Sequence, residues 1–187
     1  MNILGISCGH EANAAIFVDN RLVAAVAEER FTRLKMEMGY PKKAVDYCIR
    51  AGRIGSEELD CIVLVSENDP PDQYIVDRIS TFSVDDFVME QNEYWKPRFF
   101  EGKDTDYMSV FRDKISMRAL DLSIFLNNNK MSLHERVEVY NEMKKEAITN
   151  QLGIDKSKIR TIIHEKAHIY IWFICKPYER KNAGFYK

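Results

Sequence analysis

Three short apolar runs at the start of the chain constrain its fold more than any other feature. Residues 2–7, 14–18 and 22–27 are each long enough for a buried strand and too short for a stable helix. Asp19 and Asn20 join the second run to the third, and both residue types tolerate the positive φ angles of a tight hairpin turn. The pattern predicts an antiparallel three-stranded meander.

A helix and a fourth strand are predicted after the meander. Pro41 stands where the first residue of a helix is expected, and Ala44, Val45, Cys48 and Ile49 form an apolar stripe at helical spacing. Gly52 is predicted to end this helix. The apolar residues 61–65 predict the fourth strand.

The rest of the chain is predicted to be mainly helical up to a fifth strand. We expect a helical insertion at about residues 68–153, with one helix from about 107 to 126. Ser132 and Glu135 have the spacing of a capping box, which starts a helix that Gly153 ends. Further along, the sequence predicts a strand at 159–163, a helix at 164–175 and the start of another strand at 183–186.

These elements predict a single α/β domain over residues 1–187, with a mixed five-stranded sheet, flanking helices and the helical insertion. The later strands are expected to run parallel through right-handed crossovers. This order matches one lobe of an actin-like or sugar-kinase-like ATPase, an architecture in which two lobes enclose the nucleotide.

The charge and hydropathy of the chain limit the kinds of partner that it is expected to bind. With 27 Lys and Arg against 29 Asp and Glu, the net charge is −2, which gives no positive field for nucleic acid or an anionic membrane. The longest apolar stretch, residues 169–175, is far shorter than the roughly 20 residues of a membrane-spanning helix. Since nucleic acid and membranes are both disfavoured, we expect a small-molecule or protein partner.

Four cysteines without CxxC spacing predict a reduced, cytoplasmic protein.

The turn at residues 8–13 is the first candidate for chemistry. His10 stands beside Glu11, and this pair could relay a proton or hold a metal-bound phosphate. Gly9 would let the backbone approach a ligand closely. The alternative interpretation is a solvated hairpin turn, and spacing alone favours that alternative.

A run of mixed charges after the third strand is the second candidate. Arg30, Arg33 and Lys35 could bind an anionic phosphate, since guanidinium groups suit bidentate contact. Mixed charges in such a position also form ordinary solvated faces. Composition does not choose between these interpretations.

The third candidate is a pair of histidines, His164 and His168, after the fifth strand. Residues four apart share one helix face, so both imidazoles could bind one divalent metal, with a third ligand from elsewhere. Glu165 completes the HExxH pattern of zinc proteases, but a protease would hold the pair inside a long helix. A purely structural role for both histidines is the alternative.

Four segments of the chain resemble the start of the carbamoyltransferase family, which includes nodulation-factor and antibiotic O-carbamoyltransferases. The similarity is dense over the first 65 residues, loose through the insertion, and returns at the histidine pair. Its most specific piece is the run Glu-Glu-Arg-Phe-Thr-Arg that begins at Glu28. The four segments are residues 1–7, 9–15, 23–35 and 40–44.

The resemblance implies an ATPase-like lobe of an enzyme that forms carbamoyl adenylate from carbamoyl phosphate and ATP and carbamoylates a hydroxyl of a small-molecule or glycan acceptor. By position, His164 and His168 would bind a divalent metal such as iron, zinc or manganese. His10 and Glu11 would lie near the reacting group, and Arg30, Arg33 and Lys35 remain candidates for phosphate binding.

Family members run to several hundred residues, so the resemblance also implies that these 187 residues form the N-terminal lobe only and are inactive alone. A second lobe or a partner protein would complete the site. The alternative is a non-catalytic lobe that serves as a binding or interaction module. Bulky residues at 169–173 and the aromatic cluster of Tyr94, Trp95, Phe99 and Phe100 predict self-association or recruitment of a partner.

Overall fold

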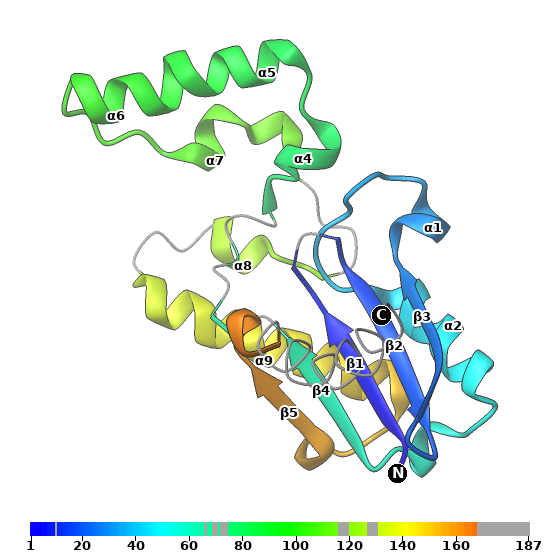
Figure 1. Cartoon of the computed structure of the whole chain (residues 1–187). Helices are drawn as coiled ribbons and strands as arrows, with labels where there is room; N and C mark the ends of the chain where they lie inside the picture. The colour runs from blue at the N-terminus through cyan, green and yellow to red at the C-terminus, as the bar shows by residue number, and fades with distance from the viewer. Residues whose placement is uncertain are drawn as a thin grey trace, which may run out of the picture.

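Five strands form one mixed sheet in the order β3-β2-β1-β4-β5 (Figure 1). The computed structural model describes residues 1–9, 11–65, 67–68, 71, 75–115, 120–126 and 131–167. β1 pairs antiparallel with β2 and parallel with β4, while β4 pairs parallel with β5. The α/β class and the mixed five-stranded sheet predicted from the sequence are thus confirmed. The strands are β1 (Ile3–Ser7), β2 (Asn13–Val18), β3 (Arg21–Ala27), β4 (Cys61–Val65) and β5 (Ile159–Ile162).

The hairpin between β2 and β3 forms as the sequence predicts. Asp19 and Asn20 have φ angles of 50° and 63°, the left-handed region that a two-residue hairpin turn requires. β1, β2 and β3 then pair antiparallel as the expected meander.

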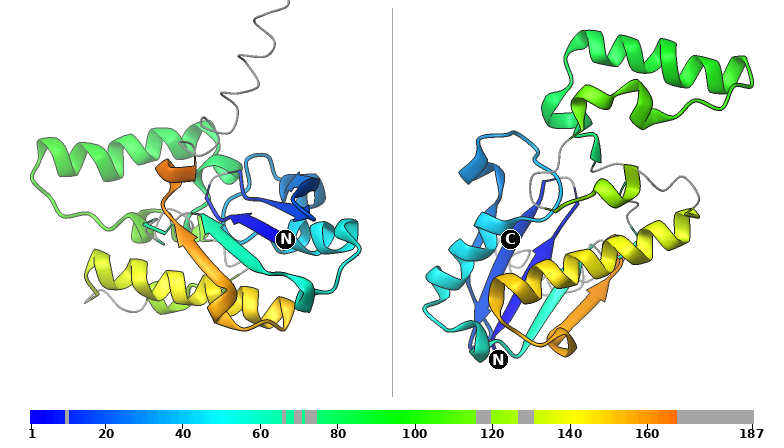
Figure 2. Two further views of the ribbon diagram at one scale, coloured as in Figure 1. Left: turned by 60° about the horizontal axis from the view of Figure 1, so that its bottom comes forward. Right: turned by 180° about the vertical axis from the view of Figure 1, so that it is seen from behind.

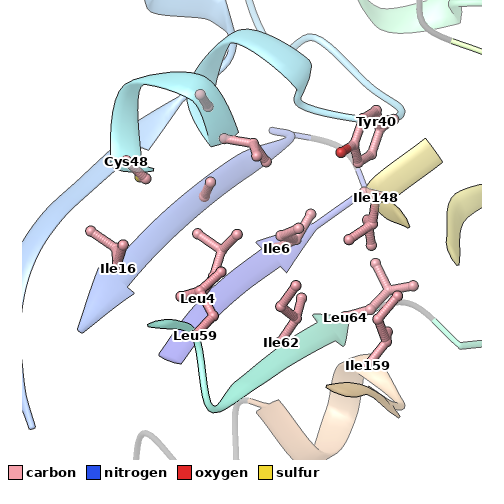
Figure 3. Close-up of a cluster of buried hydrophobic side chains, with 14 of the residues drawn as sticks. Leu4, Ile6, Ile16, Tyr40, Cys48, Leu59, Ile62, Leu64, Ile148 and Ile159 are labelled. Atoms are coloured by element: carbon pink, nitrogen blue, oxygen red, sulfur yellow. The ribbon is translucent and has the colours of Figure 1, made fainter. Parts of the chain in front are cut away.

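One face of the sheet carries the main hydrophobic core. Alternate strand residues such as Leu4, Ile6 and Ile62 are fully buried, because successive side chains of a strand point to opposite faces. Two helices cover this face, α2 (Lys42–Gly52) through Val45 and Cys48, and α9 (Leu133–Leu152) through Ile148. Figure 3 shows Cys48 and Ile148 on the same side of the strands.

The end of α2 differs from the prediction in one respect. Gly52 is the last helical residue, and Arg53 takes the left-handed conformation that ends the helix, with φ of 52°. A Cβ atom at position 52 would lie 2.9 Å from Cδ1 of Ile16. Glycine at this position therefore allows α2 to approach β2 closely.

The capping box of α9 is confirmed. The Ser132 hydroxyl accepts a hydrogen bond from the Glu135 N–H, the Glu135 carboxylate accepts one from the Ser132 N–H, and Gly153 ends the helix with φ of 66°. Because Ile148 belongs to the main core, the helical region expected at about 68–153 contributes this helix to the body of the domain. The 3-10 turns η1 (Ser56–Glu58) and η4 (Lys156–Lys158) precede β4 and β5.

A helical arm, which we define as residues 78–114, stands beyond the sheet (Figure 2). A bridge between Val76 and Ile115 closes its base. Its own packing is largely aromatic, with Phe111 fully buried and 4.6 Å from Phe82 between ring centroids. The arm comprises α4 (Arg78–Thr81), α5 (Val84–Met89), the π-helix η2 (Glu90–Trp95), α6 (Lys96–Phe100), α7 (Tyr107–Val110) and the 3-10 turn η3 (Arg112–Lys114).

The single helix predicted from about 107 to 126 is wrong. α7 ends at Val110, and Phe111 leaves helical geometry with ψ of 38°. Packing of Phe111 against Phe82 and the bridge at Ile115 outweigh helix propensity here. A separate short helix, α8, follows at Ser123–Leu126.

Residues 164–167 are helical, as predicted. The remainder of that predicted helix, the strand predicted at 183–186 and the apolar run 169–173 lie outside the described residues. Cys8 and Cys48 are free thiols buried in the main core, as their apolar surroundings predict. Among the described helices none is long and apolar enough to cross a membrane.

Candidate functional site

The three candidate segments identified in the sequence all lie at one edge of the sheet. The last paired residues of β1, β4 and β5 are Ser7, Val65 and Ile162, and they lie side by side in register. In the other direction Ser7 pairs with Asn13 at the start of β2, and Asn13 pairs with Ala27 at the end of β3. These five residues form a single row across the sheet, which we call the carboxyl edge.

The candidate segments leave the sheet directly from this row. The turn at residues 8–13 joins Ser7 to Asn13, the charged segment 28–35 follows Ala27, and His164 comes two residues after Ile162. Each of the outer segments is two strand positions from β1, or about 10 Å along the edge at the usual strand spacing. Ligands of open α/β sheets bind beyond the carboxyl ends of strands. The arrangement therefore makes this edge the candidate site.

Backbone hydrogen bonds fasten the turn at 8–13 to the loop at 33–39. The Ala12 N–H donates to the Glu37 carbonyl at 2.8 Å, and the Gly39 N–H donates to the Cys8 carbonyl at 3.2 Å. Glu11 is exposed at the rim, while Cys8 is buried. His10 lies outside the described residues.

Three of the six non-glycine residues with positive φ in the described part of the chain lie in these two segments. Glu11, Arg33 and Met36 have φ angles of 58°, 65° and 56°, which L residues adopt at a cost. Such conformations persist where surrounding contacts hold them, and they cluster at functional sites. Here the Met36 N–H donates to the Glu29 carboxylate at 2.9 Å, and this hydrogen bond holds Met36 in its left-handed conformation.

The three cations of the charged segment are exposed. Arg30 lies in the short helix α1 (Glu29–Thr32), and its guanidinium is 3.6 Å from the Glu29 carboxylate. Arg33 ends α1 in its left-handed conformation, and Lys35 follows on the exposed side of the loop. All three therefore stand near the carboxyl edge and face solvent, where they can meet an anion.

Glu28 is a buried residue whose role the sequence did not reveal. Its side chain is 5% exposed, and its carboxylate accepts hydrogen bonds from the Lys43 N–H at 3.1 Å and the Ala44 N–H at 2.7 Å. Burial raises the pKa of Glu28, and these two backbone hydrogen bonds counter that effect in part. Because Pro41 offers no side-chain cap, Glu28 caps α2 from outside the helix.

The same residue ties α2 to the candidate turn. The Glu28 N–H donates to the Ala12 carbonyl at 2.8 Å, so one residue contacts both the helix and the end of the turn. Glu37 is buried as well, and its carboxylate accepts a short hydrogen bond from the Thr32 hydroxyl. The only sequence signal for these contacts is the absence of a capping residue before Lys42.

His164 is half-buried at the carboxyl edge, and His168 lies outside the described residues. Within the described part of the chain, no group of three or more His, Cys, Asp or Glu side chains is close enough to hold a metal ion. The described residues thus supply one imidazole toward the expected metal site and do not complete it.

The carboxyl edge, its glycine-containing turn and the histidine after β5 together make up the candidate site of an α/β domain. The sequence matches the family of carbamoyltransferase N-termini over residues 2–185. Since this match covers nearly the whole chain, the protein belongs to that family, as the resemblance predicted.

Three relatives share short segments with the chain. The protein sll1178 of Synechocystis sp. is 44% identical over 63 residues, which cover 33% of this chain and 10% of the relative. The protein MJ1051 of Methanocaldococcus jannaschii is 45% identical over 47 residues, 25% of this chain and 9% of the relative. The nodulation protein NolNO of Sinorhizobium fredii is 32% identical over 53 residues, 28% of this chain and 8% of the relative. The matched segments thus span a tenth or less of each relative.

Proposed function

We propose that this chain is the ATPase-like lobe of a carbamoyltransferase, with its carboxyl edge facing carbamoyl phosphate and ATP. The acceptor would be a hydroxyl of a small molecule or glycan. Carbamoyl adenylate would form from carbamoyl phosphate, water and ATP with release of phosphate and pyrophosphate. The acceptor oxygen then attacks its carbamoyl carbon, the bond to the adenylate oxygen breaks, AMP leaves, and the hydroxyl proton passes to a base. The observation that carries this proposal is the register row, which gathers the family's most specific segment, the turn and His164 at one edge.

The strand order of the sheet supports the ATPase-like assignment. An antiparallel meander next to parallel strands, in the order β3-β2-β1-β4-β5, is the arrangement expected of one actin-like lobe. A cleft between two such lobes would exclude water and orient the reactants, which one lobe alone cannot do. We therefore expect these 187 residues alone to show no ATP-dependent carbamoyl transfer.

The roles of individual residues follow from their places along the edge. Arg30, Arg33 and Lys35 are exposed cations beside the turn, suited to bind phosphate oxygens. Glu11 is an exposed carboxylate on the turn itself, suited with His10 to accept the proton of the acceptor hydroxyl.

His164 and His168 are proposed to bind a divalent metal through their neutral imidazoles. When bound, such a metal would neutralise charge on phosphoryl and acyl oxygens. Titration of Mn²⁺ or Zn²⁺ into the wild type and a His164→Ala, His168→Ala double variant tests this role. The wild type should bind weakly and the double variant more weakly still, whereas equal affinity would contradict the assignment.

Ligand binding tests the phosphate role directly. Calorimetric titration of ATP and of carbamoyl phosphate into Arg33→Ala and Lys35→Ala should show several-fold weaker binding than the wild type, because each variant loses a charge-assisted contact. Arg53→Ala is a matched control, since Arg53 is also exposed and left-handed but ends α2. An equal loss in the control would point to a general charge effect and against the site.

A non-catalytic interaction module is the second candidate function. The exposed aromatic residues Phe99 and Phe100 of the arm favour it, because a surface of this kind fits a protein partner. This alternative allows weak nucleotide binding but no binding of carbamoyl phosphate at the carboxyl edge, so the calorimetric titration of carbamoyl phosphate separates the two candidates.

A further inference from the structure

The continuous helix formed by α5, η2 and α6 turns an apolar face outward from the arm. Val84 and Val88 are 79% and 53% exposed near one end, and Phe99 and Phe100 are 72% and 84% exposed at the other. Between these ends lies the six-residue π-helix η2, a rare geometry that is frequent at functional sites. The helix therefore carries large apolar side chains on its solvent side.

A groove of about 530 Å³ occupies the half of this face that ends at Phe100. Trp95 and Phe99 are stacked, with ring centroids 5.4 Å apart and planes 6° from parallel. Two amide side chains stand at the middle of the helix, between the apolar ends. The groove is lined by Gln91, Asn92, Trp95, Lys96, Phe99 and Phe100.

The exposed apolar area is sufficient for a pairing of two identical faces. Phe99 and Phe100 together expose the equivalent of about one and a half whole aromatic side chains, or roughly 300 Å². With Val84 and Val88 the face offers roughly 500 Å², so two copies would bury roughly 1,000 Å², about the least that a specific interface needs.

The polar groups on the face are also self-complementary. Gln91 and Asn92 each carry both donors and acceptors, so the same pair from a second copy can satisfy them. When two such helices cross antiparallel near these amides, Lys96 comes within about one helical turn of Asp85 of the partner subunit. A two-fold axis creates this opposite-charge pair twice.

We propose that this face is a homodimer interface, in which the arms of two copies pair antiparallel about a two-fold axis near Gln91 and Asn92. The occupant is a second copy of this chain, because area, amides and charges all match the face to itself. The interface lies on the arm and involves no residue of the carboxyl edge.

Sedimentation over a low to high micromolar range tests the interface. The wild type should show a monomer–dimer equilibrium, and Phe100→Glu should weaken it about tenfold or more by placing an unpaired charge in the contact. Leu133→Glu is the matched control, because Leu133 is 63% exposed on α9, outside the arm. Circular dichroism establishes that both variants fold, and Phe100→Ser provides a second, uncharged variant.

A charge exchange tests the antiparallel arrangement. Asp85→Lys and Lys96→Asp should each weaken the dimer, by up to about fivefold for exposed pairs, and the double variant should restore it. A wild type that stays monomeric at high micromolar concentration would overturn the proposal. A dimer unaffected by both Phe100 variants would overturn the interface, and failure of the double exchange to restore the dimer would overturn its antiparallel geometry.

Discussion

Glu28 links α2 to the candidate turn through contacts that the neighbouring sequence does not predict. Its carboxylate accepts the N–H groups of Lys43 and Ala44, and its own N–H donates to the carbonyl of Ala12. Since the segment 28–35 also carries the exposed cations, a buried carboxylate and exposed guanidinium groups occur within a few residues of each other. Glu28 holds the segment in place, and Arg30 and Arg33 remain accessible to a ligand.

Removal of the Glu28 carboxylate should destabilise the domain. Glu28→Ala leaves the buried N–H groups at the start of α2 without an acceptor, a loss of roughly 1–3 kcal/mol in the free energy of unfolding. Denaturant unfolding measures this loss, with Glu93→Ala as the control because Glu93 is exposed on the arm. Equal stability of the Glu28→Ala variant and the wild type would contradict the capping role.

The raised pKa of Glu28 also predicts a pH dependence. Above the ordinary value of 4.5, the folded protein keeps a proton that the unfolded chain has already released. The free energy of unfolding contributed by this group therefore falls as pH rises from 4.5 through the folded pKa. Glu28→Gln cannot ionise, so its unfolding free energy should depend less on pH across that window. Identical pH slopes for the variant and the wild type would refute this prediction.

At the scale of elements, a buried carboxylate connects α4, η2 and α7 in the arm. Glu90 is 2% exposed and accepts two hydrogen bonds from Arg78, at 2.8 and 2.9 Å, and one from the Tyr107 hydroxyl at 2.7 Å. Burial by itself raises the pKa of Glu90, but these hydrogen bonds outweigh it and hold the pKa below its ordinary range. The network fixes three elements to one another.

Loss of Arg78 should therefore loosen the arm. Arg78→Met leaves the Glu90 carboxylate buried without its cation, and we expect a loss of about 2 kcal/mol, less than for a fully buried pair because Arg78 is 45% exposed. Tyr107→Phe should cost about 1 kcal/mol. Denaturant unfolding followed by tryptophan fluorescence measures both. A larger loss for Tyr107→Phe than for Arg78→Met would contradict the account of the network.

Elements with local signals could be predicted from the sequence, and elements determined by distant contacts could not. Asp19 and Asn20 set the hairpin, and the capping box of Ser132 and Glu135 starts α9, because each depends on neighbours within a few residues. The break after α7 depends instead on Phe111 packing against Phe82, nearly thirty residues earlier. The Glu28 cap on α2 also joins residues that are distant in sequence, so hydrophobic periodicity could not predict it.

At the scale of the whole molecule, the strand order explains how segments far apart in sequence reach one site. β1 and β5 are separated by about 150 residues yet lie on either side of β4, with their carboxyl ends in one row. Glu11, Arg33 and His164 come from three separate segments of the sequence, and the sheet register places those segments along the same edge. Glu11 and Arg33 are exposed and His164 is half-buried, so a ligand at this edge can be detected in solution.

The most direct test of this account is an amide NMR titration of the chain with carbamoyl phosphate, which detects even weak binding and locates it. We expect shifts concentrated at the carboxyl edge, at Gly9, Glu11, Arg33 and His164, with none at the Asp19–Asn20 hairpin at the opposite end of β2. Shifts confined to the arm or to that hairpin, or no shifts at millimolar ligand, would contradict it.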